Sequence, residues 1–195
     1  MPRPDVSHER IPQILDAAAE LFSRRGLDGA GMNELSEATG LSKAAIYHYF
    51  PSKDSIVHHL VERLFTTDQP HLEALVDEVN RSATERLLEY VDQLANYLVE
   101  TSGLQPVFLE SFSRASRDPV IAQMISKFFL GYHRLCEEII RQGRAAGEFD
   151  DSLQPKSAAS ALVTQVEGCI VIASLTEEPV EKLLRKNLRF LIERL

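Results

Sequence analysis

The sequence predicts an all-α protein, and three observations support this fold class. Apolar residues recur at the three- and four-residue spacing of amphipathic helices over most of the 195 residues. Nine prolines punctuate the chain, and between the later ones the helical spacing is kept. The sequence contains no hairpin turn between alternating apolar runs and no internal repeat.

The first predicted helix begins near Ile11 and ends at Gly26. One stripe of its surface is apolar and consists of Ile11, Ile14, Leu15, Ala18, Leu21 and Phe22. Pro12 is expected in the first turn, where amide hydrogens have no intrahelical acceptor in any case. Gly26 is expected to end the helix because glycine adopts positive φ without a steric penalty.

Two short helices joined by a tight turn are predicted between residues 32 and 50. Met32 and Leu35 supply the buried face of the first helix, and Gly40 suits the positive φ that ends it. Ser42 is placed to cap the second helix. This pattern fits a helix-turn-helix, whose second helix enters the major groove of DNA, although the corner alone also fits any pair of antiparallel helices.

The residues around and after this turn favour the DNA-binding interpretation. Residues 40–53 contain two lysines, one histidine and no acidic residue. Ser52 is expected to cap the next helix, whose free amides and positive dipole end would then face passing phosphates. Tyr47 and Tyr49 are either phosphate contacts or core aromatics, and Phe50 is assigned to the core.

The rest of the chain predicts further helices. One helix is predicted over residues 56–70 and a single long helix over 72–98. Two further helical segments begin at Pro106 and Pro119, and the two most apolar helices cover about 155–174 and 179–195. Proline is tolerated at the first helical position because no intrahelical bond is lost there.

Composition excludes several classes of protein. Hydrophobic residues make up 44% and charged residues 26% of the chain, which fits a soluble globule and not a disordered chain. The formal net charge of −8 excludes a protein that coats nucleic acid through bulk positive charge. No continuous apolar run approaches the roughly 18 residues of a membrane span. The expected location is the cytoplasm, because the N-terminus also lacks the apolar segment of a secretory signal.

Residues with chemical reactivity do not form a catalytic or metal-binding motif. Cys136 and Cys169 are 33 residues apart, match no metal or redox spacing, and are interpreted as buried thiols, with a redox role left open. The sequence has no His-Glu-x-x-His pattern, no phosphate-binding glycine loop and no nucleophile elbow. We therefore expect no metal site, no cofactor and no catalytic site, with an enzyme on a helical bundle as the alternative.

Several stretches carry a resemblance to a known family. They are Ile-Leu-Asp-Ala-Ala-Ala-Glu-Leu-Phe at 14–22, the stop at Gly26, Thr-Gly-Leu-Ser-Lys at 39–43 and Ile-Tyr-His-Tyr-Phe-Pro-Ser-Lys at 46–53. The segment resembles the DNA-binding domain of the tetracycline-repressor (TetR) family of bacterial transcription regulators. The resemblance implies base contacts for Lys43, Ala44 and Ala45. It implies phosphate contacts for Ser42, Tyr47, Tyr49 and Lys53, with His48 able to make either kind.

Two positions depart from the family pattern. The family usually has Thr or Ser where Gly31 stands, so that only a backbone amide could replace the lost side-chain contact to phosphate. Ser36 stands where alanine is usual, and its hydroxyl is expected to bond back to its own helix. Gly31 stays in the expected DNA-binding set.

The resemblance also implies a division of the chain. A three-helix DNA-binding domain is expected over residues 1–60, and a larger helical domain that binds an effector and dimerises over 61–195. A homodimer is expected through the last two helices, about 155–174 and 179–195, although both could be core helices of a monomer. The expected DNA partner is a double-stranded palindromic operator.

Candidate effector contacts lie on the middle helices and the helix before last. They combine aromatic rings with a few thioether, amide and thiol groups, and consist of Tyr90, Tyr97, Phe108, Phe112, Met124, Phe128, Phe129, Tyr132, Gln165 and Cys169. Such walls favour an apolar or aromatic effector, whereas the same helical spacing also fits a plain core.

The sequence therefore predicts a ligand-responsive transcriptional regulator. The simplest form is a repressor that its effector releases from the operator. An activator or a partner-dependent regulator on the same fold is the alternative.

Overall fold

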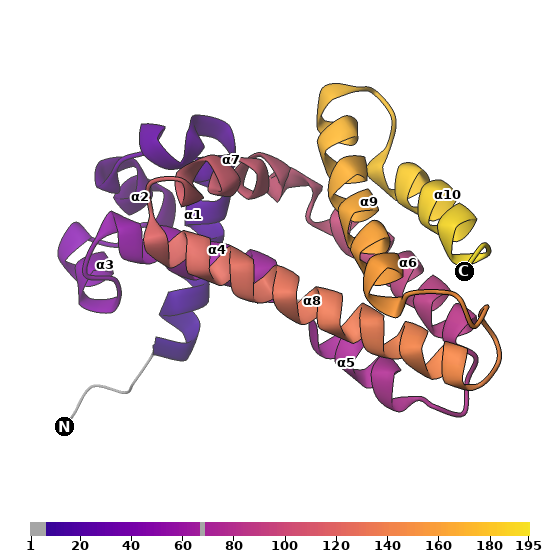
Figure 1. The fold of residues 1–195 in the computed structure, drawn as a ribbon. Coiled ribbons are helices and arrows are strands. Elements are labelled where there is room, and N and C mark those ends of the chain that lie inside the picture. Colours follow the sequence, from indigo (N-terminus) through magenta and orange to yellow (C-terminus); the bar gives the residue numbers. More distant parts are fainter. Residues whose placement is uncertain (1–6, 67–68) are drawn as a thin grey trace. The chain divides into compact units, whose positions relative to one another are not determined.

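The computed structural model describes residues 7–66 and 69–195, and these residues form helices without any strand (Figure 1). This confirms the all-α prediction. Contacts group the described residues into two compact units. The first combines residues 7–65 with Gly103–Ile125, and the second combines residues 66 and 69–102 with Ser126–Leu195.

The first unit contains the helix-turn-helix region together with a later segment of the chain. Its elements are α1 (Ser7–Gly29), α2 (Met32–Thr39), α3 (Lys43–Tyr49), α4 (Lys53–Thr66), the 3-10 helix η1 (Ser102–Leu104), α7 (Gln105–Ala115) and the start of α8 (Pro119–Ala145). Helix α1 packs against both α2 and α7, and Ile14, Leu27, Ile46 and Ile56 are fully buried in this core. The predicted domain boundary after residue 60 falls inside α4 and stays a prediction.

Helix α1 begins earlier than the sequence analysis expected. It starts at Ser7, so Pro12 lies inside the helix and not in its first turn, and that prediction is wrong. Proline at this position removes one backbone hydrogen bond near the start of α1. The burial of the apolar residues that follow outweighs the cost of this lost bond. Gly26 leaves the helical conformation with φ 77° and ψ 162°, as expected of the residue that breaks this helix.

The second unit contains α5 (Gln69–Asp77), α6 (Ala83–Glu100), the rest of α8, α9 (Pro155–Leu175) and α10 (Val180–Ile192). Helix α10 packs against both α6 and α9. Leu72, Ala95, Ile139, Ala159 and Leu184 have no exposed surface. The openings at Pro106 and Pro119 and the two last helices agree with the prediction.

The single long helix predicted over 72–98 is wrong, because the chain turns between α5 and α6. Ser82 caps α6, and its hydroxyl oxygen accepts the N–H of Glu85 at 3.1 Å. Glu148 accepts two further free amides of this helix end, Ala83 N–H at 2.7 Å and Thr84 N–H at 2.8 Å. These caps stabilise a helix start where apolar periodicity alone suggested continuity.

Helix α9 is the most apolar element of the second unit. By length and composition alone α9 could cross a membrane. The sequence analysis did not expect such a helix, because no continuous apolar run is long enough for a membrane span. A core helix of a soluble protein meets the same test, and Ala159, Leu162 and Cys169 of α9 are buried within the unit. The helix therefore does not by itself indicate a membrane protein.

Both cysteines are buried thiols, as predicted. Cys136 and Cys169 are free and buried in the second unit. Burial raises the pKa of the Cys136 thiol to about 12, so this side chain stays protonated near neutral pH.

Candidate nucleic-acid interface

The turn between α2 and α3 has the geometry that the sequence predicted. Gly40 adopts the left-handed conformation at φ 67°, and its N–H donates to the Glu37 carbonyl at 3.4 Å. The Ser42 hydroxyl oxygen accepts the N–H of Ala45 at 3.2 Å and so caps α3. Leu35 and Ile46 are buried beneath the turn. Together these features fix which side of α3 faces out.

The outward side of α3 carries the predicted DNA contacts. Ser42, Lys43, Ala44, Tyr47 and His48 are exposed, and Ala45 and Tyr49 are half-buried. We call these seven residues the α3 face. Tyr47 exposes 45% of its surface, so it is not a core aromatic, whereas Phe50 is buried as predicted. Small, cationic and hydroxyl side chains thus stand at the start of a helix that is anchored by a buried isoleucine.

The N-terminus of α4 lies directly after α3 in the chain. The Ser52 hydroxyl oxygen accepts the N–H of Ser55 at 3.0 Å, which leaves other amides of the first turn available to an anion. Lys53 is half-buried, donates from Nζ to the Asp28 carbonyl oxygen at 2.9 Å, and lies 5.9 Å above the Phe22 ring. These contacts hold the lysine beside the helix end.

The amide of Gly31 is already bound within the chain. It donates to the Glu34 carboxylate at 2.9 Å, and the same carboxylate lies 3.2 Å from Arg25. A phosphate contact at Gly31 would have to displace Glu34. The bond from Gly31 to Glu34 had a signal in the sequence, because an acidic residue three positions after the residue that caps a helix start is typical of a capping box.

Ser36 bonds differently from the prediction. Its hydroxyl donates to the Leu41 carbonyl at 2.6 Å, across the turn, and not to a carbonyl of its own helix. The expectation of a bond within α2 is therefore wrong. The left-handed Gly40 turns the chain back, which brings the Leu41 carbonyl within reach of Ser36. The serine thus helps to hold the two helices at their angle.

A network of charged side chains from α7 links three segments of the first unit, and the sequence analysis missed it. Arg114 donates from Nη1 to the Asp28 carboxylate and from Nη2 to the Asp54 carboxylate, the second at 2.6 Å. The Glu110 carboxylate accepts the N–H of Leu27 at 2.8 Å, next to the break in α1. Thus α7 binds both the end of α1 and the first turn of α4.

His58 and Asp118 extend this network. The two side chains are 2.8 Å apart between Nε2 and Oδ2, and both are mostly buried. Burial raises the pKa of the Asp118 carboxyl, but the hydrogen bonds from His58 and from the N–H groups of Ile121 and Val120 outweigh burial and lower it. The Asp118 carboxyl is therefore charged, and in this form it accepts the free N–H groups at the start of α8.

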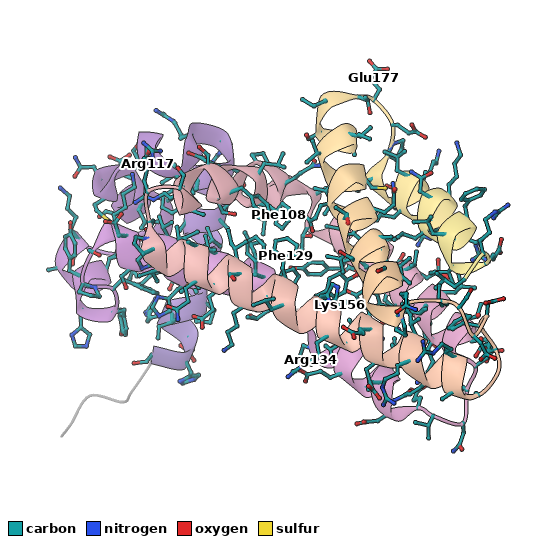
Figure 2. All side chains as sticks on the ribbon, viewed as in Figure 1. Phe108, Arg117, Phe129, Arg134, Lys156 and Glu177 are labelled. Carbon is teal, nitrogen blue, oxygen red and sulfur yellow. The ribbon has the colours of Figure 1, made fainter. Side chains whose placement is uncertain are left out.

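The candidate effector residues divide between the two units. In the first unit, the Phe108 and Phe112 rings are 5.1 Å apart between centroids, and both meet Phe65, at 5.0 and 5.9 Å respectively (Figure 2 labels Phe108 on α7). Met124, in the same unit, is half-buried. This cluster has the apolar character that the prediction required.

The other aromatic candidates meet in the second unit. Tyr132 lies 5.3 Å from Tyr90 and 5.9 Å from Phe128 between ring centroids, and Phe128 and Phe129 are 5.3 Å apart (Figure 2 labels Phe129). Tyr90 and Tyr132 line a void of about 10 Å³. A void of this size has room for about one water molecule, so it is not an effector pocket.

The polar candidates gather around one sulfur atom. Cys169 Sγ accepts from the Gln165 side-chain amide at 3.5 Å and from the Asn187 amide at 3.6 Å. Tyr97 is half-buried, and its carbonyl accepts the Thr101 hydroxyl at 2.7 Å. On the same helix as Cys169, burial raises the pKa of the Glu167 carboxyl to about 7. The sequence analysis did not single out Glu167 or Asn187.

Metal ligands do not cluster in the part of the chain that the structure describes. Among those residues, no group of three or more His, Cys, Asp or Glu side chains could hold a metal ion.

The chain is similar to known regulators over nearly its full length. Residues 14–60 match the family described as bacterial regulatory proteins, tetR family, and residues 83–195 match the BetI-type transcriptional repressor C-terminal region. The HTH-type transcriptional regulator UidR of Escherichia coli (strain K12) is 22% identical over 174 residues, which are 87% of this chain and 83% of UidR.

Solved structures share the fold. A TetR transcription regulator from Haloarcula marismortui has a TM-score of 0.84 at 16% identity and covers 95% of this chain and 97% of its own. A transcriptional regulator from Saccharomonospora viridis, solved in complex with choline, has a TM-score of 0.81 at 22% identity, with 95% and 96% covered. Regulators of the TetR family are soluble proteins that bind DNA and small-molecule effectors as dimers. The chain belongs to the TetR family, with a BetI-type C-terminal region, and is a DNA-binding transcriptional regulator.

Proposed function

We propose that this chain is a cytoplasmic repressor that binds a palindromic operator as a homodimer and leaves it when a small effector binds. The observation that carries the proposal is the α3 face, whose exposed leading residues stand on the buried Ile46. The match of residues 83–195 to a BetI-type transcriptional repressor supports repression over activation. The proposal requires no catalytic residue.

Base contacts are proposed for the first turn of α3. Lys43 suits the O6 and N7 acceptors of guanine, and the Ala44 and Ala45 methyl groups suit the thymine methyl group. The exposure of Lys43 and Ala44 supports this assignment. These residues would determine which operator sequence is preferred.

Phosphate contacts are proposed for the flanks of the same helix. Ser42, Tyr47, Tyr49, His48 and Lys53 present hydroxyl, imidazole and ammonium groups around the α3 and α4 starts. Their contacts position the protein and carry no sequence information. Gly31 would join them only if phosphate displaces the Glu34 carboxylate.

A homodimer interface is proposed on α9 and α10. Val171, Ile172 and Leu175 of α9 and Phe190 of α10 are large apolar residues that remain exposed, Leu175 by 80%. Exposed apolar patches on soluble proteins mark association surfaces. A two-fold dimer carries two α3 helices, and such a pair can read successive major grooves. The apolarity of α9 is then explained by a partner helix instead of a lipid bilayer.

A small effector is proposed to bind at one of the two aromatic clusters, each of which favours an apolar or aromatic molecule. The first cluster contains Phe108 and Phe112 and the second contains Phe128, Phe129 and Tyr132. The structurally similar Saccharomonospora viridis regulator was solved with choline, and aromatic rings also bind quaternary ammonium groups. Choline is therefore one probe to compare with an aromatic compound.

Fluorescence anisotropy tests the DNA-binding step. Labelled duplexes from the DNA that flanks the gene of this chain are titrated with the full-length protein, in competition with a random duplex of equal length. We expect salt-sensitive binding that prefers the flanking DNA by at least about 10³-fold. Equal affinity for both duplexes would contradict the proposal. Transcription in vitro from the same DNA separates a repressor from an activator.

A further inference from the structure

We propose that Arg114 is a positioning residue for DNA binding, although it lies on α7 and outside the helix-turn-helix. Its guanidinium pairs with Asp28 and Asp54 beside the start of α4 and offsets part of their negative charge, and so keeps this helix end attractive to phosphate. The inference rests on the proposed phosphate contacts of Lys53 and the α4 amides.

The geometry assigns one cation to two carboxylates. Arg114 Nη1 binds Asp28 at the end of α1, and Nη2 binds Asp54 in the first turn of α4 at 2.6 Å. The side chain of Arg114 is 18% exposed, whereas those of Asp28 and Asp54 are 65% and 62% exposed. The cation is thus held in place while both anions remain open to solvent and to any approaching phosphate.

Both carboxylates lie close to the proposed phosphate contact. The ammonium of Lys53 donates to the backbone carbonyl of Asp28, and Asp54 is the next residue in the chain. Without Arg114, two negative side chains would stand beside the lysine and the positive end of α4. Their repulsion of phosphate would oppose the attraction from the helix dipole.

Other charges nearby do not replace this cation. Asp118 lies 3.9 Å from Arg114 Nε, but its carboxylate already pairs with His58 at 2.8 Å. Arg117 lines the same open cleft, of about 360 Å³, and makes no ion pair with any described residue (Figure 2 labels Arg117). Arg114 is therefore the cation that binds Asp28 and Asp54 among the residues described.

Stability alone does not account for this arrangement. Ion pairs whose acidic partners are exposed contribute little to folding, because water already solvates the charges. The buried residues Ile14 and Val107 belong to the hydrophobic cores of α1 and α7, which pack against each other. The main effect of Arg114 is thus expected in DNA affinity.

The test compares full-length variants on a random-sequence duplex and on the DNA that flanks the gene. Arg114→Gln should weaken binding to both duplexes about tenfold at low salt. Arg117→Gln removes the same charge from the same cleft and should change affinity by less than about twofold. The loss in Arg114→Gln should shrink as the salt concentration rises, because salt screens the added repulsion.

Neutralising both anions should reverse the loss. The triple variant Arg114→Gln/Asp28→Asn/Asp54→Asn should bind at least as tightly as the unchanged protein, whereas a merely structural role predicts no rescue. Asp28→Asn/Asp54→Asn alone should bind more tightly. Circular dichroism and thermal melts check folding, and the Asp28→Asn/Asp54→Asn double variant decides the question if Arg114→Gln does not fold.

The outcomes separate two failures. Unchanged affinity of a folded Arg114→Gln, absence of rescue, or weaker binding by the double variant would overturn the role of Arg114. If the unchanged protein binds neither duplex, the proposed DNA contacts fail as well. Arg114→Lys keeps the charge and should retain most of the affinity.

Discussion

Replacing Glu167 by glutamine should raise stability at pH 8 and leave it almost unchanged at pH 4. Burial raises the pKa of this carboxyl to about 7, from a usual value of 4.5. The folded protein therefore binds the proton more tightly than the unfolded chain. The favourable contribution is complete below pH 4.5 and is lost as the pH rises to about 7.

The size of the effect follows from the same pKa. At about 1.4 kcal/mol per pH unit, a rise from 4.5 to about 7 corresponds to at most about 3.5 kcal/mol. In a chain of this length that equals a melting-temperature change of at most about 7–14 °C. Glutamine has the shape of the neutral acid and should remove this pH dependence.

Thermal melts at fixed protein concentration measure the effect between pH 4 and pH 8. Glu177→Gln is the matched control, because Glu177 is exposed in the turn between α9 and α10 (Figure 2). Equal melting curves for Glu167→Gln and the unchanged protein at pH 8 would refute the reasoning. A stabilisation by Glu177→Gln of the same size would show that net charge, and not burial, is responsible.

Three further predictions concern packing, DNA and the dimer. Gly143→Ala should destabilise the fold by about 1–3 kcal/mol, because the new Cβ would lie 2.4 Å from a Phe149 ring carbon. Urea unfolding measures this loss, and Gly103→Ala is the control because its Cβ would meet nothing within 4 Å. Lys53→Gln should weaken binding to all DNA sequences alike and reduce the salt slope by about one in anisotropy titrations, and a change of sequence preference instead would contradict its role as a phosphate contact. Leu175→Asp should convert the dimer to monomer in analytical ultracentrifugation, whereas the same change at Val79, also exposed, should leave it dimeric; a dimeric Leu175→Asp would place the interface elsewhere.

Local signals in the sequence predicted most of the helical framework. The turn at Gly40, the cap at Ser42 and the buried Ile46 depend on residues a few positions apart, and the structure confirms them. The same holds for the two proline-initiated segments. Where the prediction of one helix over 72–98 failed, a local signal existed, since Ser82 and Glu85 have capping-box spacing.

Contacts between distant segments could not be predicted. Arg114 binds residues that precede it by 86 and 60 positions, and no periodicity relates them. The bond from Ser36 to Leu41 depends on how the turn folds back. Most effector candidates are aromatic residues at helical spacing, a pattern that also describes a core, so the role of the set stays a proposal.

The central claim is that two α3 faces in one dimer read successive major grooves, and hydroxyl-radical footprinting of the operator tests it most directly. We expect two protected regions whose centres are separated by about 10 base pairs or a multiple of this spacing. In Lys43→Gln the protection should weaken in both regions together. One short protected region, or a footprint unaffected by Lys43→Gln, would contradict the claim.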